Sequence, residues 1–545
     1  MIINKVVSTG PALSVPSHLS FGQYAIDKLR QHCEGDDAIA VINGDTDEKI
    51  SYRQILQETV NVATGLRRLG VKRGDVVGLC SENRDEFIPT ALAVVCCGAT
   101  VTTFNVLYTK DEITHVLNIS RPKIMFASEV GLKQNLETIK TVPSIEKIIQ
   151  LNGKPIASGI LEYRSVKVQV DPNEFEAEEV QGWSDVVYIL YSSGTTGLPK
   201  GVMLTHLNVL YSASSFELES RLQDSTLLTI VPWYHAYGLM STVNYILVKK
   251  KLVYLNGFNP LKYLGAIQNY KVTFLAAVPP IVVFLAKAPI VEKFDLSSII
   301  AVWCGAAPLS SETITLALKR MKNCKGIFQA YGMTETSLAA TKDVDDEKIV
   351  SKPGSGGYPL YGVKAKVVDL DTRKKLGPNE NGEICLKGPI IMKGYAGDEA
   401  ATRAIFDEEG YMNTGDVGYY DKDGCFFIVD RLKELIKYKG HQVAPAVVES
   451  VVLGHAGVAE CGVVGAPDEA VGELATAFVV KKPGATLTEK ELLEFTAARL
   501  SSVSRLHGGV IFVDEIPKNL SGKILRRALK QKLLNTKEQT VNKLV

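Results

Sequence analysis

Short apolar runs alternate with stretches of helical periodicity through the first two thirds of this chain. Residues 75–80 (DVVGLC) and 122–128 (PKIMFAS) have the length and composition of buried strands, whereas residues 84–98 and 130–142 repeat apolar positions at helical spacing. The same alternation resumes between residues 271 and 321. Strands that alternate with helices in this way predict parallel β-sheets joined by crossover helices.

The pattern changes in the last third of the chain. From about Lys364 short strands of alternating polarity are separated by Gly and Asp turns, which predicts a small antiparallel section. A compact unit then restarts, in which residues 457–482 predict paired strands and Ser521 begins an expected final helix. We therefore expect an α/β protein with two domains. Residues 1–431 form a large domain of stacked βαβ sheets plus the antiparallel section, and residues 432–545 form a mobile α+β C-terminal lid.

Composition and charge narrow the class of protein. With 61 basic and 60 acidic residues among 545, the chain has no net charge that would attract nucleic acid, and 46% hydrophobic residues are ordinary for a globular enzyme. Nine cysteines without a Cys-x-x-Cys pair indicate buried thiols and a reducing compartment. No apolar stretch suggests a membrane span or a secretion signal. The final residues NKLV are only a degenerate peroxisomal address, so we expect an intracellular protein, peroxisomal or cytoplasmic, that is a monomer or weak dimer.

One polar stretch, YSSGTTGLPKGVMLTH at residues 191–206, combines glycines, hydroxyls and a lysine and contains no carboxylate. This composition suits a phosphate, because glycine lets backbone N–H groups approach a ligand while hydroxyls and lysine add donors and charge. The stretch matches neither a Walker loop nor a dinucleotide fingerprint. A flexible linker is the alternative, but linkers are not entered directly from an apolar run such as residues 185–191. We therefore predict a hydroxyl-rich phosphate loop that follows a buried strand.

Further polar islands interrupt the apolar sequence beyond this loop. They are PWYHAYG (232–238), GAAPLS (305–310), QAYGMTET (329–336), YMNTGD (411–416), DRLKELIKYKGHQVAP (430–445) and PKNLSGK (517–523). In this order, the loop and the islands resemble the adenylate-forming superfamily of acyl-CoA synthetases, 4-coumarate-CoA ligases and beetle luciferases. The resemblance extends from about residue 20 to residue 535, and it is strongest to insect luciferase-like acyl-CoA synthetases.

The resemblance implies an ATP site with Mg²⁺ held by Glu335, because Mg²⁺ needs only one or two carboxylates beside substrate phosphates. The implied nucleotide contacts are Ser192, Ser193, Gly194, Thr195, Thr196, Gly197 and Lys200 for the phosphates, Thr334 for the α-phosphate, Gly305, Ala306, Ala307, Pro308, Gln329, Ala330 and Tyr331 for the adenine with Gly332 beside them, and Asp416 with Arg431 for the ribose. Without the resemblance, Asp416 is an ordinary turn residue, Glu335 a helix N-terminal carboxylate and Lys200 a surface lysine.

The resemblance also implies an acyl pocket. It places His235 at the mouth, where this histidine would orient the substrate carboxylate, although a lone histidine is more often structural than catalytic. A zinc site is excluded here, because no second His or Cys lies nearby at ligand spacing. The expected apolar walls of the pocket are Trp233, Tyr237, Cys304 and Leu338.

The resemblance implies a reaction in two steps, in which the acid first forms an acyl-adenylate with ATP and the acyl group is then transferred to CoA. The lid would contribute charged residues to both steps. Lys523 would bridge the attacking carboxylate and the α-phosphate as negative charge gathers there. On the other face of the lid the implied contacts with AMP and CoA are Lys437, which we also count as catalytic, and Lys439, Gly440 and Gln442. Lys433 marks the hinge of the family, at the joint between the two domains.

The expected function is that of an acyl-CoA synthetase that uses ATP, Mg²⁺ and coenzyme A to activate a fatty or aromatic carboxylic acid. The alternative is a luciferase that oxidises an adenylated luciferin. Two departures from beetle luciferases weigh against it: the segment YSASSFELE lacks their arginine, and Leu338 replaces their small serine after TET. A decayed homologue that only binds ligands is a third possibility, but Asp416, Arg431, Lys437 and Lys523 are all intact.

Overall fold

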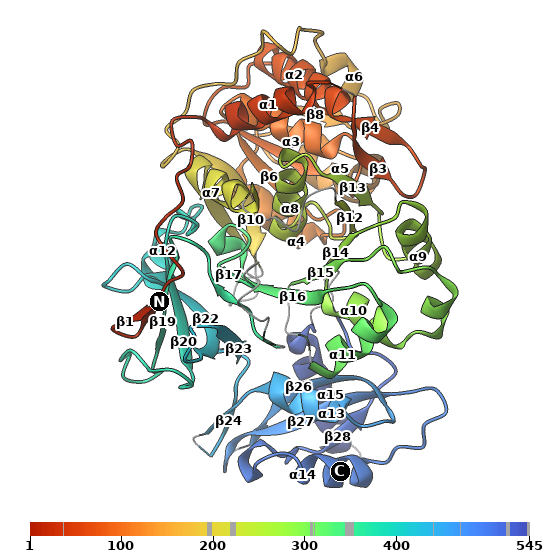
Figure 1. The fold of residues 1–545 in the computed structure, drawn as a ribbon, viewed down its shortest axis with the longest axis vertical. Helices are drawn as coiled ribbons and strands as arrows, with labels where there is room; N and C mark the ends of the chain where they lie inside the picture. Colours follow the sequence, from red (N-terminus) through yellow and green to blue (C-terminus); the bar gives the residue numbers. More distant parts are fainter. Residues whose placement is uncertain are drawn as a thin grey trace.

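The computed structural model of the protein describes residues 1–35, 37–192, 199–217, 225–305, 309, 311–343, 352, 354–439, 441–468, 470–518 and 524–541, without the side chains of residues 311, 312 and 534–541. Figure 1 shows stacked sheets and helices from red to green, a third sheet beside them in teal, and a smaller body in blue.

The first sheet is parallel through its centre, with an antiparallel hairpin at one side. In spatial order its strands are β21 (Gly394–Tyr395), β11 (Lys200–Thr205), β10 (Val186–Ser192), β6 (Thr100–Phe104), β5 (Val76–Cys80), β7 (Ile124–Ala127), β8 (Lys147–Gln150) and β9 (Ile160–Glu162). Every residue of β6 and β7 is buried, as expected for central strands covered on both faces.

The second sheet repeats this architecture. Its order is β18 (Tyr358–Pro359), β17 (Thr341–Lys342), β16 (Gly326–Tyr331), β15 (Ala301–Cys304), β14 (Phe274–Ala277), β12 (Thr226–Thr229), β13 (Lys251–Tyr254), β3 (Ile39–Asn43) and β4 (Lys49–Ser51). Strands β16, β15 and β14 run parallel, so their carboxyl ends lie at one edge of the sheet. Ligands of open α/β sheets bind beyond that edge.

Helices fill the space between the two sheets and cover both outer faces. Those between the sheets are α1 (Phe21–His32), α2 (Tyr52–Arg68), α3 (Phe87–Cys96), α7 (His206–Glu217) and α8 (Ala236–Leu247), which share one hydrophobic core with both sheets. Helix α3 (FIPTALAVVC) has no charged residue and is buried at every position, since apolar strands lie around it. The outer helices are α4 (Lys110–Ser120) and α5 (Glu129–Lys140) on the first sheet, and α9 (Pro260–Asn269), α10 (Pro279–Lys287) and α11 (Ser311–Arg320) on the second.

The third sheet is antiparallel. Its order is β1 (Ile2–Ile3), β2 (Val6–Val7), β19 (Lys364–Val368), β20 (Gly382–Lys387), β22 (Met412–Tyr420) and β23 (Phe426–Arg431). Val7 of β2 pairs with Ala365 of β19, so the start of the chain joins a sheet made from its last third. The short elements of the large domain are α6 (Tyr163–Val166), η2 (Pro289–Lys293), η3 (Thr334–Thr336) and α12 (Glu399–Ile405).

The small body lies at the lower end of the view in Figure 1 and has its own sheet. The strands are β25 (His441–Val443), β24 (Ile436–Tyr438), β27 (Gly472–Lys481) and β26 (Val458–Asp468), with β28 (Val510–Phe512) parallel to β27. The helices are α13 (Pro445–Leu453), α14 (Glu489–Ala497), η4 (Ser502–Ser504) and α15 (Arg526–Val541). Thr488 caps α14 through the backbone N–H of Glu491, at 3.3 Å.

These elements confirm the α/β fold predicted from the sequence, with a large N-terminal and a small C-terminal domain. Residues 75–80 hold β5 and residues 130–142 hold α5, and β26 and β27 are the paired strands expected at 457–482. The final helix begins at Arg526, and Ile524 just before it bridges Lys518. Ser521, where the sequence placed the start of this helix, lies outside the described residues. Throughout the described ranges, no helix combines the length and the apolar character that a membrane crossing requires.

Candidate active site

Asp416 is a buried carboxylate at the edge where the sheets meet, and two neighbouring side chains bind it. Its register partner in the antiparallel pair of β22 and β23 is Arg431, whose Nε lies 2.7 Å from Asp416 Oδ1. The hydroxyl of Tyr331, the last residue of β16, donates to Asp416 Oδ2 at 2.7 Å. Asp416 is only 3% exposed, and its carboxylate is held from two sides by Arg431 and Tyr331. A carboxylate has two acceptor oxygens, a number that suits the two hydroxyls of a ribose.

The charges of this cluster are set by burial and by the partners. Burial raises the pKa of Tyr331 well above its usual range, and the neighbouring Asp416 carboxylate raises it further. Burial opposes the charge of Arg431, but Asp416 together with Tyr331, Glu335 and Glu434 outweighs burial and raises the pKa of the guanidinium. Tyr331 therefore remains a proton donor and Arg431 a cation at physiological pH.

Gln329 connects the predicted adenine segments. Its Oε1 accepts from the backbone N–H of Leu309 at 3.0 Å, and its Nε2 donates to the carbonyl of Ser355 at 3.4 Å. Gln329 also pairs in register with Cys304, directly before Gly305. The side-chain amide of Gln329 therefore connects β16 to the chain at Leu309 and at Ser355.

Gly332 is required by a close backbone contact. A Cβ at this position would lie 1.9 Å from the carbonyl oxygen of Leu338, so no side chain fits there. Ser337 and Leu338 both have left-handed backbone conformations, with φ of 52° and 99°. The turn that follows η3 is therefore held tightly against the end of β16, beside Ala330 and Tyr331.

Glu335, in η3, joins the two sheets. Its Oε1 accepts from the Ser192 hydroxyl at the end of β10 (2.9 Å) and from the Tyr395 hydroxyl in β21 (3.1 Å), while its carbonyl accepts from the N–H of Met392. The residue is 6% exposed. Both donors converge on one carboxylate oxygen, and Oε2 faces neither of them. Thr334 precedes Glu335 in the same turn.

Lys200 lies beside this carboxylate. It pairs with Ser192 across the hairpin of β10 and β11, and its Nζ is 4.6 Å from the centre of the Tyr395 ring. Tyr395 therefore contacts Lys200 through its ring face and Glu335 through its hydroxyl. The sequence reasoning missed Tyr395, since no motif marks it and its partners lie about 60 and 195 positions away.

The predicted acyl residues divide into two groups. Tyr237 and Cys304 share the core cluster of the second sheet, where the Tyr237 hydroxyl lies 3.4 Å from the carbonyl of Ala277. Burial raises the pKa of the Cys304 thiol to about 12, so this thiol is unreactive. Trp233 lies instead in the core between the sheets, with ring centroids 4.8 Å from Tyr254 and 5.9 Å from Phe87. Trp233 therefore does not lie in the cluster that contains Tyr237 and Cys304.

His235 and Leu338 are the other two residues predicted for the acyl pocket. His235 is the N-cap residue of α8, and burial lowers the pKa of its imidazole from 6.5 to about 4. The ring is therefore neutral at physiological pH and packs on the ring of Tyr234, 4.6 Å between centroids. Leu338 is half-buried against the core between the sheets.

The predicted lid residues lie on an exposed hairpin. Lys437 and Gln442 face each other in β24 and β25, and Lys439 follows with a left-handed φ of 48°. The backbone N–H of Lys437 donates to Glu473 Oε2 at 3.0 Å. Lys433 is exposed in the turn after β23. The predicted residues Ser193, Gly194, Thr195, Thr196, Gly197, Ala306, Ala307, Pro308, Gly440 and Lys523 lie outside the described residues.

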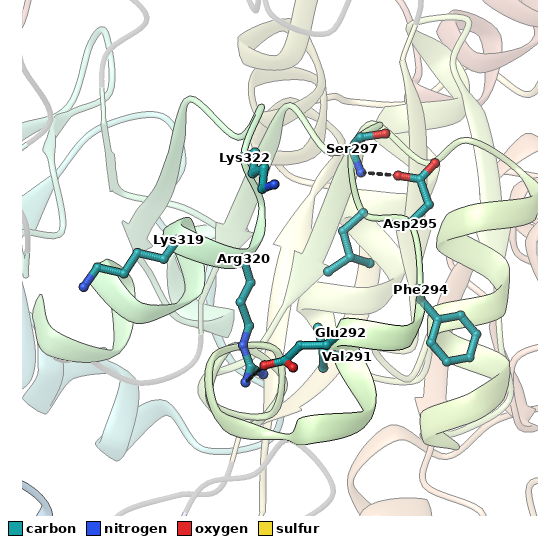
Figure 2. A pocket seen from close by; sticks show the side chains of 9 residues that line it. Val291, Glu292, Phe294, Asp295, Ser297, Lys319, Arg320 and Lys322 are labelled. Carbon is teal, nitrogen blue, oxygen red and sulfur yellow. Dashed lines mark hydrogen bonds and ion pairs between the residues drawn. The ribbon is translucent and has the colours of Figure 1, made fainter.

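A cavity of about 460 Å³ lies away from this site, between η2 and the end of α11 (Figure 2). Its walls include Phe294, Leu296 and Lys322, and Arg320 closes one side by an ion pair with Glu292 at 3.1 Å. None of the residues predicted for the nucleotide or the acid lines it, so we assign it no role in the reaction.

Comparisons with known proteins agree with this arrangement of groups. Residues 29–396 match the family of the AMP-binding enzymes, and residues 447–523 match the C-terminal domain of AMP-binding enzymes. The luciferin 4-monooxygenase of Nipponoluciola cruciata is 41% identical over 511 residues, 91% of each chain. The 4-coumarate–CoA ligase CCL1 of Humulus lupulus is 37% identical over 535 residues, 96% of each chain.

A solved structure extends the similarity to the whole fold. The crystal structure of ATP-bound MatB from Rhodopseudomonas palustris superposes with a TM-score of 0.83 at 28% identity, covering 94% of this chain and 99% of that one. The family model spans more than half of the sequence, and the relatives cover nearly all of it. The chain therefore belongs to the AMP-binding enzymes, the family of adenylate-forming enzymes that contains acyl-CoA ligases and beetle luciferases.

Proposed function

We propose that this protein is an ATP-dependent acyl-CoA synthetase that activates a fatty or aromatic carboxylic acid. The observation that carries the proposal is the buried Asp416 carboxylate, held by Arg431 and Tyr331 at the edge of the sheets. A carboxylate fixed in position, with two acceptor oxygens, suits the two hydroxyls of a ribose. Ribose is common to ATP and to an acyl-adenylate, so one group can hold the nucleotide through both steps.

In the first step a carboxylate oxygen of the acid attacks the α-phosphorus of ATP, the bond to the β-phosphate oxygen breaks, and pyrophosphate leaves with that electron pair. His235 has a neutral imidazole, which can donate one hydrogen bond to the acid and hold it in line. Lys200 and Lys523 supply positive charge where negative charge gathers. No covalent bond to the protein is required.

The same site fits Mg²⁺, which binds through one or two carboxylates together with substrate phosphates. Glu335 is buried, and its Oε1 is occupied by the hydroxyls of Ser192 and Tyr395, so Oε2 is the oxygen offered to a cation. The ion would neutralise charge on the phosphates during their transfer. Ser192 leads directly into the predicted phosphate loop, so cation and phosphates would meet there.

In the second step the thiolate of coenzyme A attacks the acyl carbon and AMP leaves, which requires different protein groups. We propose that residues 432–545 rotate as a lid about Lys433, so that Lys523 serves the first step. Lys437, Lys439 and Gln442, which are exposed, then serve the second step together with Gly440. The exposed turn at Lys433 and the exposed hairpin of β24 and β25 support this assignment.

The test is pyrophosphate release over a panel of fatty and cinnamic acids, followed by thioester formation after CoA is added. We expect ATP-dependent release with at least one class of acid. Lys523→Ala should abolish this release and largely spare thioester formation from a supplied acyl-adenylate, because its charge is needed only in the first step. Loss of both half-reactions to the same extent would remove Lys523 from that role.

A luciferase is the second candidate, and it is favoured by the luciferin 4-monooxygenases among the relatives. Helix α7 argues against a luciferase, because its sequence HLNVLYSASSFE lacks the arginine that beetle luciferases carry in this helix. Its last residue, Glu217, points to α1 instead, where Lys28 Nζ (2.6 Å) and the Tyr24 hydroxyl (2.7 Å) bind the carboxylate. We expect at most very faint light with luciferin, ATP and oxygen, and bright emission would reverse the ranking of the two functions.

A further inference from the structure

Asp430 is a buried carboxylate placed at the joint between the two domains. It is the residue before Arg431 near the end of β23 and is 8% exposed. Its Oδ1 accepts from the backbone N–H of Arg431 at 2.7 Å, and its Oδ2 accepts from the backbone N–H of Ala446 at 2.8 Å. Ala446 is the second residue of α13, in the small domain. A single side chain thus connects the last strand of one domain to the first helix of the other.

Helix α13 needs this acceptor. The first N–H groups of a helix have no partner inside it, and a side chain of the N-cap residue normally accepts from them. Here the N-cap residue is Ala444, which has no polar side chain, and Pro445 has no N–H. The first turn of α13 contains no acidic residue of its own. Asp430 provides both the acceptor and the negative charge that favour a helix N-terminus.

The other contacts near the joint are of two kinds. Val417 of β22 packs in one apolar cluster with Leu435 and Ala444, and these contacts have no fixed direction. Arg526 of α15 binds Glu434 at 2.7 Å and both oxygens of Glu449, and these three residues belong to the small domain and would move together. The charge of Arg526 also attracts Asp430 across the joint, without a hydrogen bond between these two described residues. The hydrogen bond from Ala446 to Asp430 is directional and spans the joint.

We infer that Asp430 is a positioning residue, which caps α13 from the large domain and thereby favours the lid orientation seen in this structure. The inference rests on the proposed function, in which the lid rotates about the turn at residues 432–434. Such a rotation must draw the Ala446 N–H away from Asp430 Oδ2, so that α13 loses its cap in the other orientation. The capping contact therefore biases the balance between the two half-reactions.

The test compares Asp430→Ala and Asp430→Asn with Thr488→Ala. Thr488 caps α14 entirely within the lid, so its loss removes a helix cap without touching the joint. Pyrophosphate release and thioester formation from supplied acyl-adenylate are measured separately in single turnover. We expect Asp430→Ala to shift the ratio of the two rates by about tenfold, as the loss of a helix N-cap implies, with one rate falling and the other not. Asp430→Asn should shift it less, because the amide oxygen still accepts.

Tryptic cleavage at Lys433 gives a readout that does not depend on activity, since this lysine lies in the exposed turn of the joint. We expect Asp430→Ala to be cleaved several times faster than the wild type, and Thr488→Ala at the wild-type rate. An unchanged ratio and cleavage rate in Asp430→Ala, or equal effects of Thr488→Ala, would overturn the inference. If no acid releases pyrophosphate in the wild type, the proposed function fails, whereas cleavage still reports on the contact.

Discussion

At the scale of single residues, the candidate site depends on how a few buried polar groups are held. Tyr331 shows this most directly, because its hydroxyl donates to Asp416 Oδ2 and burial keeps it protonated. We expect Tyr331→Phe to raise the KM for ATP about tenfold, since a hydrogen bond to a charged group contributes roughly 1.5–3 kcal/mol. The value of kcat should change less, because the hydroxyl fixes the carboxylate that we propose for the ribose and not a group at the reacting phosphate.

The measurement is steady-state pyrophosphate release at varied ATP. Tyr420→Phe is the matched control, because this buried tyrosine at the end of β22 donates to the backbone carbonyl of Leu376 and not to Asp416. Equal KM values for ATP in the two variants would mean that the Tyr331 hydroxyl does not support nucleotide binding.

Some residue predictions could be made from the sequence and some could not. Asp416, Arg431, Gln329 and Glu335 stand in polar islands, and the structure brings each to the same edge of the sheets. Tyr395 could not be found, because its role arises from the pairing of β21 with β11, two strands far apart in the sequence. Trp233 illustrates a different limit, since an aromatic side chain beside a site serves the pocket or the core equally well on sequence grounds.

At the scale of elements, η3, β11 and β21 meet at Tyr395, whose hydroxyl donates to Glu335 of η3 and whose ring contacts Lys200 of β11. These two contacts can be removed separately. Tyr395→Phe removes the donor to Glu335 but keeps the ring below Lys200, whereas Tyr395→Leu removes both. We expect Tyr395→Phe to change the Mg²⁺ concentration for half-maximal pyrophosphate release and leave the KM for ATP near normal. Tyr395→Leu should also raise that KM by about twofold to fivefold, because a cation–π contact contributes roughly 0.5–1 kcal/mol.

Titrations of Mg²⁺ at saturating ATP, and of ATP at saturating Mg²⁺, separate these effects. Identical behaviour of the two variants would show that the ring does not orient Lys200. A normal Mg²⁺ response in both would count against Glu335 as the cation ligand.

The first residue of α7 makes stability depend on pH. His206 is fully buried, its Nδ1 accepts from the N–H of Phe21 at 3.1 Å, and burial lowers its pKa from 6.5 to about 4. Below pH 6.5 the unfolded chain binds a proton that the folded state excludes, so stability is complete above pH 6.5 and declines as the pH falls toward 4. From pH 8 to pH 5 this group alone should cost about 2 kcal/mol of unfolding free energy.

Denaturant unfolding of the wild type and of His206→Gln at both pH values measures this contribution. The glutamine oxygen can accept from Phe21 but does not titrate, so the variant should lose about 2 kcal/mol less on acidification. Parallel losses in the two proteins would show that His206 is already protonated in the folded state.

Elements were predicted best where the hydrophobic pattern was long and regular. The alternation that gave β5, α3, β7 and α5 reflects strands and helices buried in the middle of a layered stack. The described part of α15 begins at Arg526, whereas the expected start at Ser521 lies outside the described residues. The bridge between Lys518 and Ile524 is a local pairing that periodicity does not reveal. Strands β1 and β2 were missed, since two residues each are too short for any pattern.

At the scale of the whole molecule, the small domain has cores of its own. One is built around Val448, Val463 and Leu492, and a second around Phe478 and Leu529. We therefore expect residues 432–545, made separately, to unfold cooperatively, with an enthalpy near 0.7 kcal/mol per residue at about 60 °C. The full chain should then show more than one calorimetric transition.

Calorimetry of the two fragments and of the full chain tests the proposed domain boundary. Residues 1–431 should retain ATP binding, because Asp416, Arg431 and Tyr331 remain together, but should not form thioesters. If the fragment 432–545 does not fold, the contact of Val417 with Leu435 and Ala444 is more important to the small domain than its own cores.

The pairing of Val7 with Ala365 has a consequence for synthesis on the ribosome. A strand cannot pair before its partner has been made, and this partner is 358 residues later in the chain (365 minus 7). At roughly 5–20 residues per second, the delay is about 20–70 s. The side chain of Val7, which is 1% exposed in the finished protein, spends that time without its sheet. The earliest translated strands are thus among the last to be placed, and the nascent chain presents an unpaired edge throughout most of its translation.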